Sequence, residues 1–214
     1  VVFLPDTIRN NAENLAKQYA GSITLGMGQF CTNPGLLIAM DGEGLDLFLQ
    51  QLSQEIEKVI PAKMLHSGIH KAYVEKRAAA LLVKGVSVVA EAVTAAITIE
   101  ALPTVAKVDG KIFLQNPLLH EEVFGPYSLL VKCKDMEELK AVWKSLAGQL
   151  TTTLMGTDKD VADHVSLLDI AQSIAGRIVF KGVTAGVEVC ASMVDGGPFP
   201  DSTDSTYTAL SIHA

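Results

Sequence analysis

The sequence has few charged residues for its length and no concentration of positive charge. Of the 214 residues, 19% are Asp, Glu, Lys or Arg, and the formal net charge is −7. Nucleic-acid-binding domains usually carry a basic patch, whereas the 17 Lys and Arg residues of this chain are scattered. We therefore expect no nucleic acid as a partner. Because 49% of the residues are hydrophobic, disorder of the whole chain is excluded as well.

Cysteine is also rare, and the sequence lacks a long hydrophobic run. The three cysteines are far apart and odd in number, so they indicate neither a disulfide framework nor a Cys-x-x-Cys pair. This usage favours a reducing, cytoplasmic location. The most hydrophobic region, residues 81–102, is interrupted by Lys84, Glu91 and Glu100. No run reaches the roughly 18 apolar residues of a membrane span, and we expect no membrane partner.

Hydrophobic spacing predicts helices that alternate with strands. Helices are expected over 6–19, 45–60, 66–84, 135–150 and 159–175. Strands are expected over 36–40, 127–133, 151–155 and 177–180, with further β-branched sequence over 95–108. Loops are expected over 21–35 and from 182 onward. This alternation predicts an α/β fold with a mainly parallel sheet and helices on both faces.

Cys31 is the strongest candidate for a reactive side chain. It lies within Gly26–Gly35, where several glycines and the Asn33-Pro34 pair permit unusual backbone angles and the close approach of a ligand. A cysteine that only fills a core does not need such a loop. Cys133 and Cys190 lie in apolar sequence instead, and we expect them to be packed. A thiolate at Cys31 could serve as a nucleophile.

Two further segments combine a stiff turn with an aromatic ring. In Glu121–Pro126, adjacent carboxylates precede Phe-Gly-Pro, a rigid turn that would direct one carboxylate and one ring the same way. Such a pair suits a ribose and its heterocycle, although adjacent carboxylates are more often solvated. The second segment, Gly196–Pro200, presents Phe199 and is weaker evidence, because such loops are common.

Phosphate-binding and metal-binding motifs are missing. No Gly-rich phosphate loop and no G-x-G-x-x-G between a strand and a helix is present. His66 and His70 are four residues apart on a predicted helix, but no third ligand accompanies them. We therefore expect no metal site, and no dinucleotide fingerprint within this chain.

Taken in order, Gly28–Cys31, Glu121–Pro126 and Pro198-Phe199 resemble the motifs of the aldehyde dehydrogenase superfamily. Cys31–Leu36, together with Gly182–Val189 and the Gly196 turn, looks like the branch of 2,5-dioxovalerate (α-ketoglutarate semialdehyde) dehydrogenases. The resemblance spans nearly the whole chain but only the catalytic domain of the family.

The resemblance implies a role for each motif. Cys31 would be the nucleophile that forms a thiohemiacetal and then a thioester, with hydride passing to NAD or NADP. The Cys31 backbone N–H would supply half of an oxyanion hole. Glu122 would hold the nicotinamide ribose, and Phe124 would pack beside the cofactor. Phe30 and Phe199 would line the aldehyde pocket.

The resemblance also implies that parts of the enzyme lie outside this chain. In this family the cofactor domain, the glutamate that activates water and the oxyanion-hole asparagine all precede the catalytic domain, and a C-terminal strand makes oligomer contacts. We expect residues 1–214 to be a catalytic-domain fragment that is inactive alone. The full-length enzyme would be a homo-oligomer that oxidises a semialdehyde such as 2,5-dioxovalerate.

Two alternatives remain open at this point. One is a standalone cysteine hydrolase or acyltransferase, in which Cys31 is paired with His66, His70, His120 or His164. The other is a non-catalytic assembly module that associates through exposed apolar surface.

Overall fold

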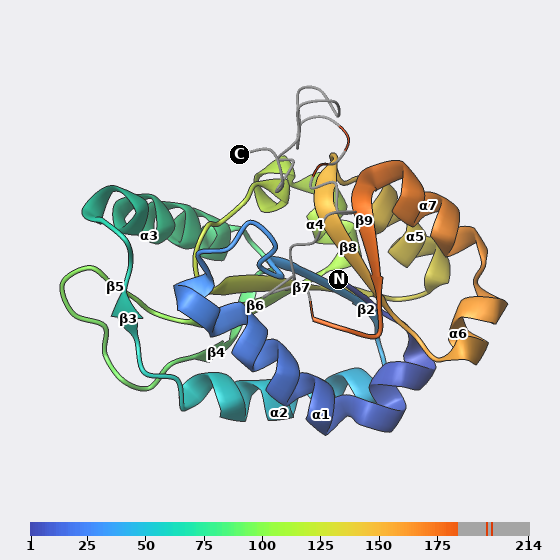
Figure 1. The fold of residues 1–214 in the computed structure, drawn as a ribbon, viewed down its shortest axis with the longest axis horizontal. Coiled ribbons are helices and arrows are strands. Elements are labelled where there is room, and N and C mark those ends of the chain that lie inside the picture. Colours follow the sequence, from blue (N-terminus) through green and yellow to red (C-terminus); the bar gives the residue numbers. More distant parts are fainter. Residues whose placement is uncertain (184–195, 197, 199–214) are drawn as a thin grey trace, which may run out of the picture.

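A central, mainly parallel sheet organises the fold, and the computed structural model describes residues 1–183, 196 and 198 (Figure 1). Within these residues seven strands form one sheet in the order β4-β6-β7-β2-β1-β8-β9, in which only the β4–β6 pair is antiparallel. A small antiparallel pair, β3 and β5, lies apart from it. The strands are β1 (Val2–Phe3), β2 (Leu36–Met40), β3 (Ala62–Lys63), β4 (Ser87–Glu91), β5 (Glu100–Ala101), β6 (Thr104–Asp109), β7 (Tyr127–Cys133), β8 (Gln149–Met155) and β9 (Ala175–Phe180).

Helices cover both faces of the sheet, which confirms the predicted α/β class (Figure 1). Side chains of a strand alternate between its faces, so in β2 Leu37 and Ala39 pack with α1 and α2 whereas Ile38 joins the opposite cluster. The helices are α1 (Pro5–Thr24), α2 (Glu43–Glu57), α3 (Ser67–Leu82), α4 (Gly110–Gln115), α5 (Met136–Lys144), α6 (Asp158–Asp163) and α7 (Ser166–Ile174), with short 3-10 turns η1 (Leu25–Gly28) and η2 (Pro117–His120).

The structure corrects several predicted boundaries. The first helix continues to Thr24, into the segment predicted as a loop, because buried Ile23 prolongs its apolar face. The predicted helix over 135–150 ends at Lys144, and β8 starts at Gln149. The predicted helix over 159–175 is two helices, α6 and α7, since the backbone leaves helical angles at His164.

Two strands of the main sheet were not predicted. The central strand β1 is only two residues long, so it gives no periodic signal, and its burial depends on neighbours far along the chain. Val2 pairs with Ile38 on one side and Leu154 on the other. The edge strand β4 lies within the hydrophobic region over 81–102.

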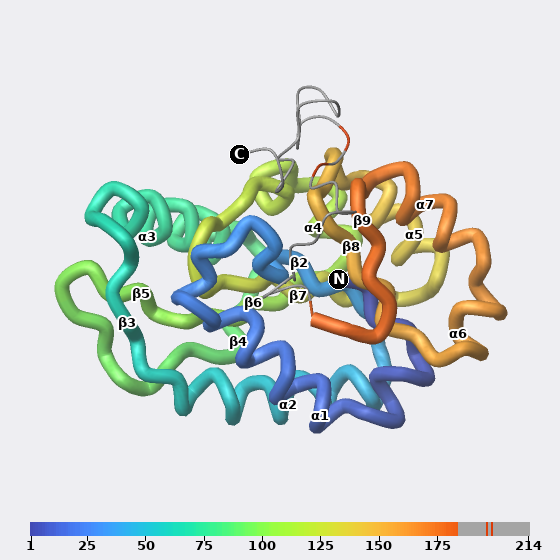
Figure 2. Tube along the Cα trace, in the orientation of Figure 1, coloured from blue at the N-terminus to red at the C-terminus, as the bar shows by residue number. Residues whose placement is uncertain are grey.

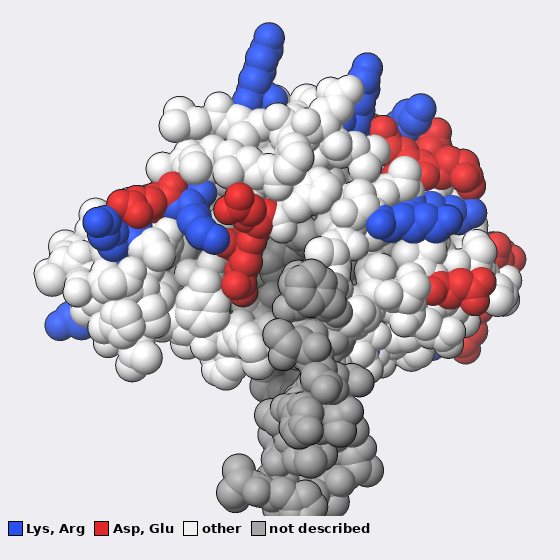
Figure 3. Space-filling model, turned by 90° about the horizontal axis from the view of Figure 1, so that it is seen from above, with Lys and Arg blue, Asp and Glu red and all other residues white. Residues whose placement is uncertain are grey.

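Outward-facing surfaces carry charges of both signs. Figure 3 shows one face on which Lys and Arg side chains lie among Asp and Glu rather than forming a field of one sign. Helix α3 and the β3–β5 pair lie at one side of the trace, and α6 and α7 lie at the other (Figure 2). Of the helices that the structure describes, none combines the length and the hydropathy needed to span a membrane.

Asp160 of α6 bonds to the start of α1, which lies 154 positions earlier in the sequence. Its buried carboxylate accepts hydrogen bonds from the backbone N–H groups of Asp6 and Thr7, at 3.1 Å each, and from Thr157 N at 2.9 Å. Burial opposes the charge, but the hydrogen bonds from Thr157, Asp6 and Thr7 outweigh it and hold the pKa of Asp160 below its ordinary value. The carboxylate thus satisfies N–H groups that the first turn of a helix leaves free.

Replacing Asp160 with Asn should lower the free energy of unfolding by about 2 kcal/mol at neutral pH, because the amide cannot accept all of these bonds. A carboxyl with a depressed folded-state pKa stabilises the fold above its unfolded pKa and loses that effect as the pH falls through the folded value. Urea unfolding should therefore show the wild-type advantage shrinking in acid. Asp163→Asn, at an exposed ion pair with Lys159, is the matched control. An advantage that is constant across pH would contradict this account.

Candidate active site

The Cys31 loop begins with left-handed backbone at the end of α1. Gly26, Met27 and Gly28 have φ values of +54°, +54° and +64°. Met27 is unusual there because a side chain disfavours positive φ. Its side chain is buried, and its sulfur accepts a hydrogen bond from Ala62 N at 3.3 Å. These contacts stabilise a reversal of chain direction after α1, which brings Cys31 to the amino end of β2.

Sheet topology brings the two main sequence motifs together. Cys31 precedes β2, the Phe-Gly-Pro bend at 124–126 precedes β7, and β2 and β7 are parallel neighbours with Leu36 opposite Leu129. The segments that enter neighbouring parallel strands lie at the same edge of a sheet. Cys31 is exposed at this edge and not packed in the core, as a purely structural cysteine would be.

Gly125 is the point at which the two loops touch. A Cβ atom at Gly28 would lie 2.2 Å from the Gly125 carbonyl oxygen, so only glycine permits this approach. Asn33 Nδ2 donates a hydrogen bond to the same oxygen at 3.0 Å. On the other side, a Cβ at Gly125 would lie 2.3 Å from the ring of Tyr73 in α3. The bend is therefore held between the Cys31 loop and α3.

Further hydrogen bonds fix the loop to β7 and the bend to α3. The buried Ser128 Oγ donates to Pro34 O at 2.6 Å, and Leu129 N donates to Gly35 O at 2.9 Å. Tyr73 OH donates to Leu102 O at 2.6 Å and lies 3.5 Å from Pro126 O in the bend. Burial raises the pKa of Tyr73, so its hydroxyl remains a proton donor.

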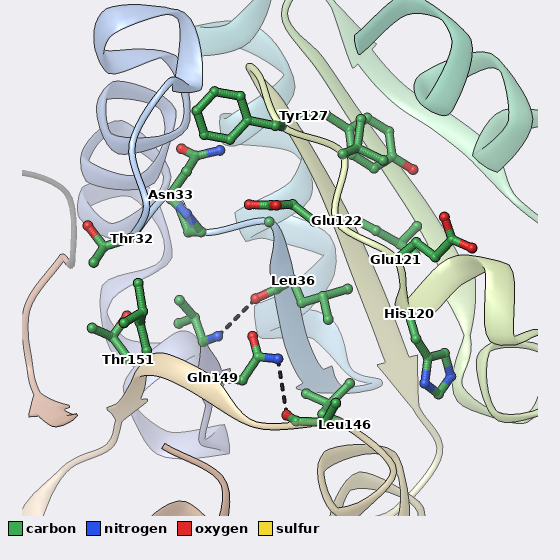
Figure 4. A pocket seen from close by; sticks show the side chains of 18 of the residues that line it. Thr32, Asn33, Leu36, His120, Glu121, Glu122, Tyr127, Leu146, Gln149 and Thr151 are labelled. Atoms are coloured by element: carbon green, nitrogen blue, oxygen red, sulfur yellow. Dashed lines mark hydrogen bonds between the residues drawn. The ribbon is translucent and has the colours of Figure 1, made fainter. Parts of the chain in front are cut away.

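A cavity of about 390 Å³ opens beside Cys31, within the usual range for small-molecule sites (Figure 4). Its wall combines residues of the Cys31 loop, the bend and the start of β8. The polar and reactive groups among its lining residues include Cys31, Asn33, Glu122, Gln149 and Thr151.

The two adjacent carboxylates point in different directions. Both residues line the cavity, but Figure 4 shows the Glu122 carboxylate directed into it and the Glu121 carboxylate directed to the opposite side. Lys76 of α3 accounts for the difference, because its Nζ donates to the backbone carbonyl of Glu122 at 3.1 Å and lies 3.7 Å from Glu121 Oε2. Across the described part of the chain, no side chain pairs with the Glu122 carboxylate, which leaves it available to accept hydrogen bonds from a ligand.

The predicted aromatic residues are placed differently from one another. Phe124 lines the cavity. Phe30 is partly exposed and packs beside Gly26, and it is not among the residues that line this cavity. Phe199 lies outside the described residues, as does Cys190. The roles of Phe30 and Phe199 in an aldehyde pocket therefore stay predictions.

Of the four histidines considered as partners of Cys31, three make other contacts in the described part of the chain. His66 Nδ1 accepts hydrogen bonds at the start of α3, and His70 Nε2 lies 3.1 Å from Glu100 O. His120 lines the cavity, but its ring stacks on Phe113 at 4.2 Å and its Nε2 lies 3.1 Å from Phe113 O. Because these imidazoles are engaged elsewhere, the hydrolase alternative is not favoured.

Sequence reasoning missed Tyr73 and Lys76, and it gave Asn33 only a backbone role. All three side chains donate hydrogen bonds to backbone carbonyls, and Tyr73 also packs against the bend. Such contacts follow no periodic pattern in the sequence. The spacing of Tyr73 and Lys76 does place them on one face of α3. Nothing in the sequence indicated that this face meets the bend.

Comparison with known proteins decides the family. No protein-family model matches the sequence. The chain is 38% identical over its whole length to an alpha-ketoglutaric semialdehyde dehydrogenase of Azospirillum brasilense and 34% identical to one of Acinetobacter baylyi. The chain belongs to the aldehyde dehydrogenase superfamily. It spans 41% of the length of each of these relatives.

A solved structure of an aldehyde dehydrogenase has the same fold. A succinic semialdehyde dehydrogenase of Streptococcus pyogenes, determined with NADP+ as the cofactor, superposes with a TM-score of 0.71 over 92% of this chain and 42% of its own. At 19% identity this likeness shows the fold alone.

Replacing Gly28 with Ala should separate the two loops, because the new methyl group meets the Gly125 backbone at a position where φ is already positive. We expect a loss of at least about 2 kcal/mol in the free energy of unfolding, measured with urea. Gly35→Ala is the control in the same loop, since a Cβ there meets no atom within 4 Å. Equal stabilities of the two variants would refute the close contact.

Cys31 should react with a limiting dose of iodoacetamide at least about tenfold faster than Cys133. Cys31 is exposed, whereas Cys133 is fully buried and burial raises its pKa to about 12. Peptide mass mapping after short exposures measures both rates, and it also tests the prediction that Cys190 reacts more slowly. Equal labelling of the three thiols would argue against a special environment for Cys31.

Proposed function

We propose that this chain is the catalytic domain of an NAD- or NADP-dependent enzyme that oxidises an aldehyde to a carboxylate, with Cys31 as its nucleophile. The observation that carries the proposal is the meeting of Cys31 with the Glu122–Pro126 bend at one cavity. An exposed thiol and a carboxylate that pairs with no described side chain suit attack on a carbonyl carbon and binding of a ribose.

In this mechanism the Cys31 thiolate attacks the aldehyde carbon and forms a thiohemiacetal. The Cys31 backbone N–H supports the oxygen as it gains negative charge. A nicotinamide cofactor, when bound, supplies the acceptor for the hydride that leaves this carbon. Cys31 then carries a thioester, which water hydrolyses to release the carboxylate and regenerate the thiol.

The residues present fit one end of such a cofactor. Glu122 can accept hydrogen bonds from ribose hydroxyls, and Phe124 can pack beside the ring. The cavity lining, as far as the structure describes it, contains no Lys or Arg. A pyrophosphate usually needs cations or a helix N-terminus, so we infer that a separate cofactor domain of the whole protein holds it.

Part of one edge of strand β8 has no paired strand among the described residues. Strand β8 begins at Gln149, but β1 meets it only from Val2 opposite Leu154. Among the described residues, no strand pairs with the β1-facing edge of Gln149–Thr153, and this edge lines the cavity beside Val1. Backbone groups at such a partly buried edge need hydrogen-bond partners. We infer that another segment of the whole protein pairs with this edge.

The proposed substrate is a semialdehyde such as 2,5-dioxovalerate, on the strength of the relatives' names. The second carboxylate of such a substrate calls for a cation, which the described cavity lining lacks, so its anchor would lie elsewhere. Phe30 and Phe199 are proposed to contact the aldehyde chain. A homo-oligomeric assembly and a cytoplasmic location complete the proposal.

The whole protein should reduce NAD or NADP in the presence of 2,5-dioxovalerate, followed by absorbance of the reduced nicotinamide. Cys31→Ala should lower kcat by at least about a thousandfold, because it removes the attacking atom. Residues 1–214 alone should show no turnover. Cys133→Ala, compared at equal folded fraction, is the control for loss of a thiol. Turnover by Cys31→Ala, or by the isolated chain, would contradict the proposal.

A further inference from the structure

Asn33 connects the two halves of the candidate site through its side chain. It lies two residues after Cys31, and its Nδ2 donates to Gly125 O, three residues after Glu122. The two bonded residues are 92 positions apart in sequence. Within the described residues, the buried Asn33 Oδ1 has no hydrogen-bond partner.

The other contacts at Gly125 cannot replace this hydrogen bond. Gly28 and Tyr73 limit how closely the neighbouring segments approach Gly125, but such steric contacts have little directional preference. The bonds from Ser128 and Leu129 hold the Cys31 loop to β7 and do not reach the bend. Tyr127 N also donates to Gly125 O, at 2.8 Å, but this bond lies within the bend and does not reach the Cys31 loop. A hydrogen bond is directional, so the Asn33 amide sets the lateral position of one loop against the other.

Stability alone does not account for an amide at this position. The hydrogen bond to Gly125 stabilises the fold, but the unpartnered Oδ1 offsets much of that gain, since a buried acceptor without a donor is costly. The Asn33 amide is therefore better explained by its alignment of the two loops than by its net contribution to the free energy of unfolding.

We propose that Asn33 is a positioning residue that keeps the Cys31 sulfur in register with the Glu122 carboxylate, and hence with the ribose that Glu122 would hold. The inference rests on the proposed function. It assigns Asn33 no contact with the reacting atoms. Small displacements of a nucleophile from its attack geometry cost large factors in rate, so the alignment affects kcat more than substrate binding.

The first test uses Asn33→Ala and Asn33→Asp in the whole enzyme. Both should lower kcat at least about tenfold with KM for the aldehyde nearly unchanged. The Asp variant has the same size but cannot donate to Gly125 O when ionised, so it separates donation from packing. Asn116→Ala removes a comparable amide-to-carbonyl bond, to Ile112 O, away from the cavity and is the control. Wild-type kcat in Asn33→Asp would overturn the proposal.

A second test does not depend on turnover. In residues 1–214, Asn33→Ala should speed backbone amide hydrogen exchange at least about tenfold in both 29–33 and 124–127, while Asn116→Ala leaves these segments unchanged. Unchanged exchange in both segments overturns the proposal. If the wild-type whole protein oxidises no aldehyde but Asn33→Ala still loosens both loops, the proposed function fails and the alignment by Asn33 stands.

Discussion

The site depends on the close approach of two loops at Gly125. Gly28 and Gly125 leave no room for a side chain between them, and the Asn33 amide bonds across the same point. Each loop enters one of two paired parallel strands, so the register of β2 against β7 determines where the loops meet. Backbone packing at Gly125, together with the Asn33 amide, therefore brings Cys31 and Glu122 to the same cavity.

Helix α3 contributes to the site in a way that its sequence does not suggest. Only Tyr73 and Ala80 of this helix are buried. Tyr73 packs on Gly125, and Lys76 binds the backbone of Glu122 while drawing Glu121 outward. Lys76 of α3 thus influences which of the two carboxylates points into the cavity. It does so from a position 46 residues before Glu122 in the sequence.

The sequence predicted the fold class and the long buried strands well, because mainly apolar runs bounded by turn residues mark β2 and β7 with their correct ends. It could not predict β1, whose two residues become a strand only because β2 and β8 lie on either side. The resemblance supplied the pairing of Cys31 with Glu122. The contacts of Asn33, Tyr73 and Lys76 were not predictable, since side-chain bonds to backbone carbonyls follow the folded geometry and no sequence pattern.

The proposed reaction depends on a covalent bond between Cys31 and the substrate carbon. Its most direct test is rapid acid quenching of the whole enzyme during turnover of 2,5-dioxovalerate with NAD or NADP, followed by mass mapping of its peptides. We expect an acyl adduct on the peptide that contains Cys31 and an unmodified peptide around Cys133. Steady turnover with the adduct on another residue, or with Cys31 unmodified throughout, would contradict it.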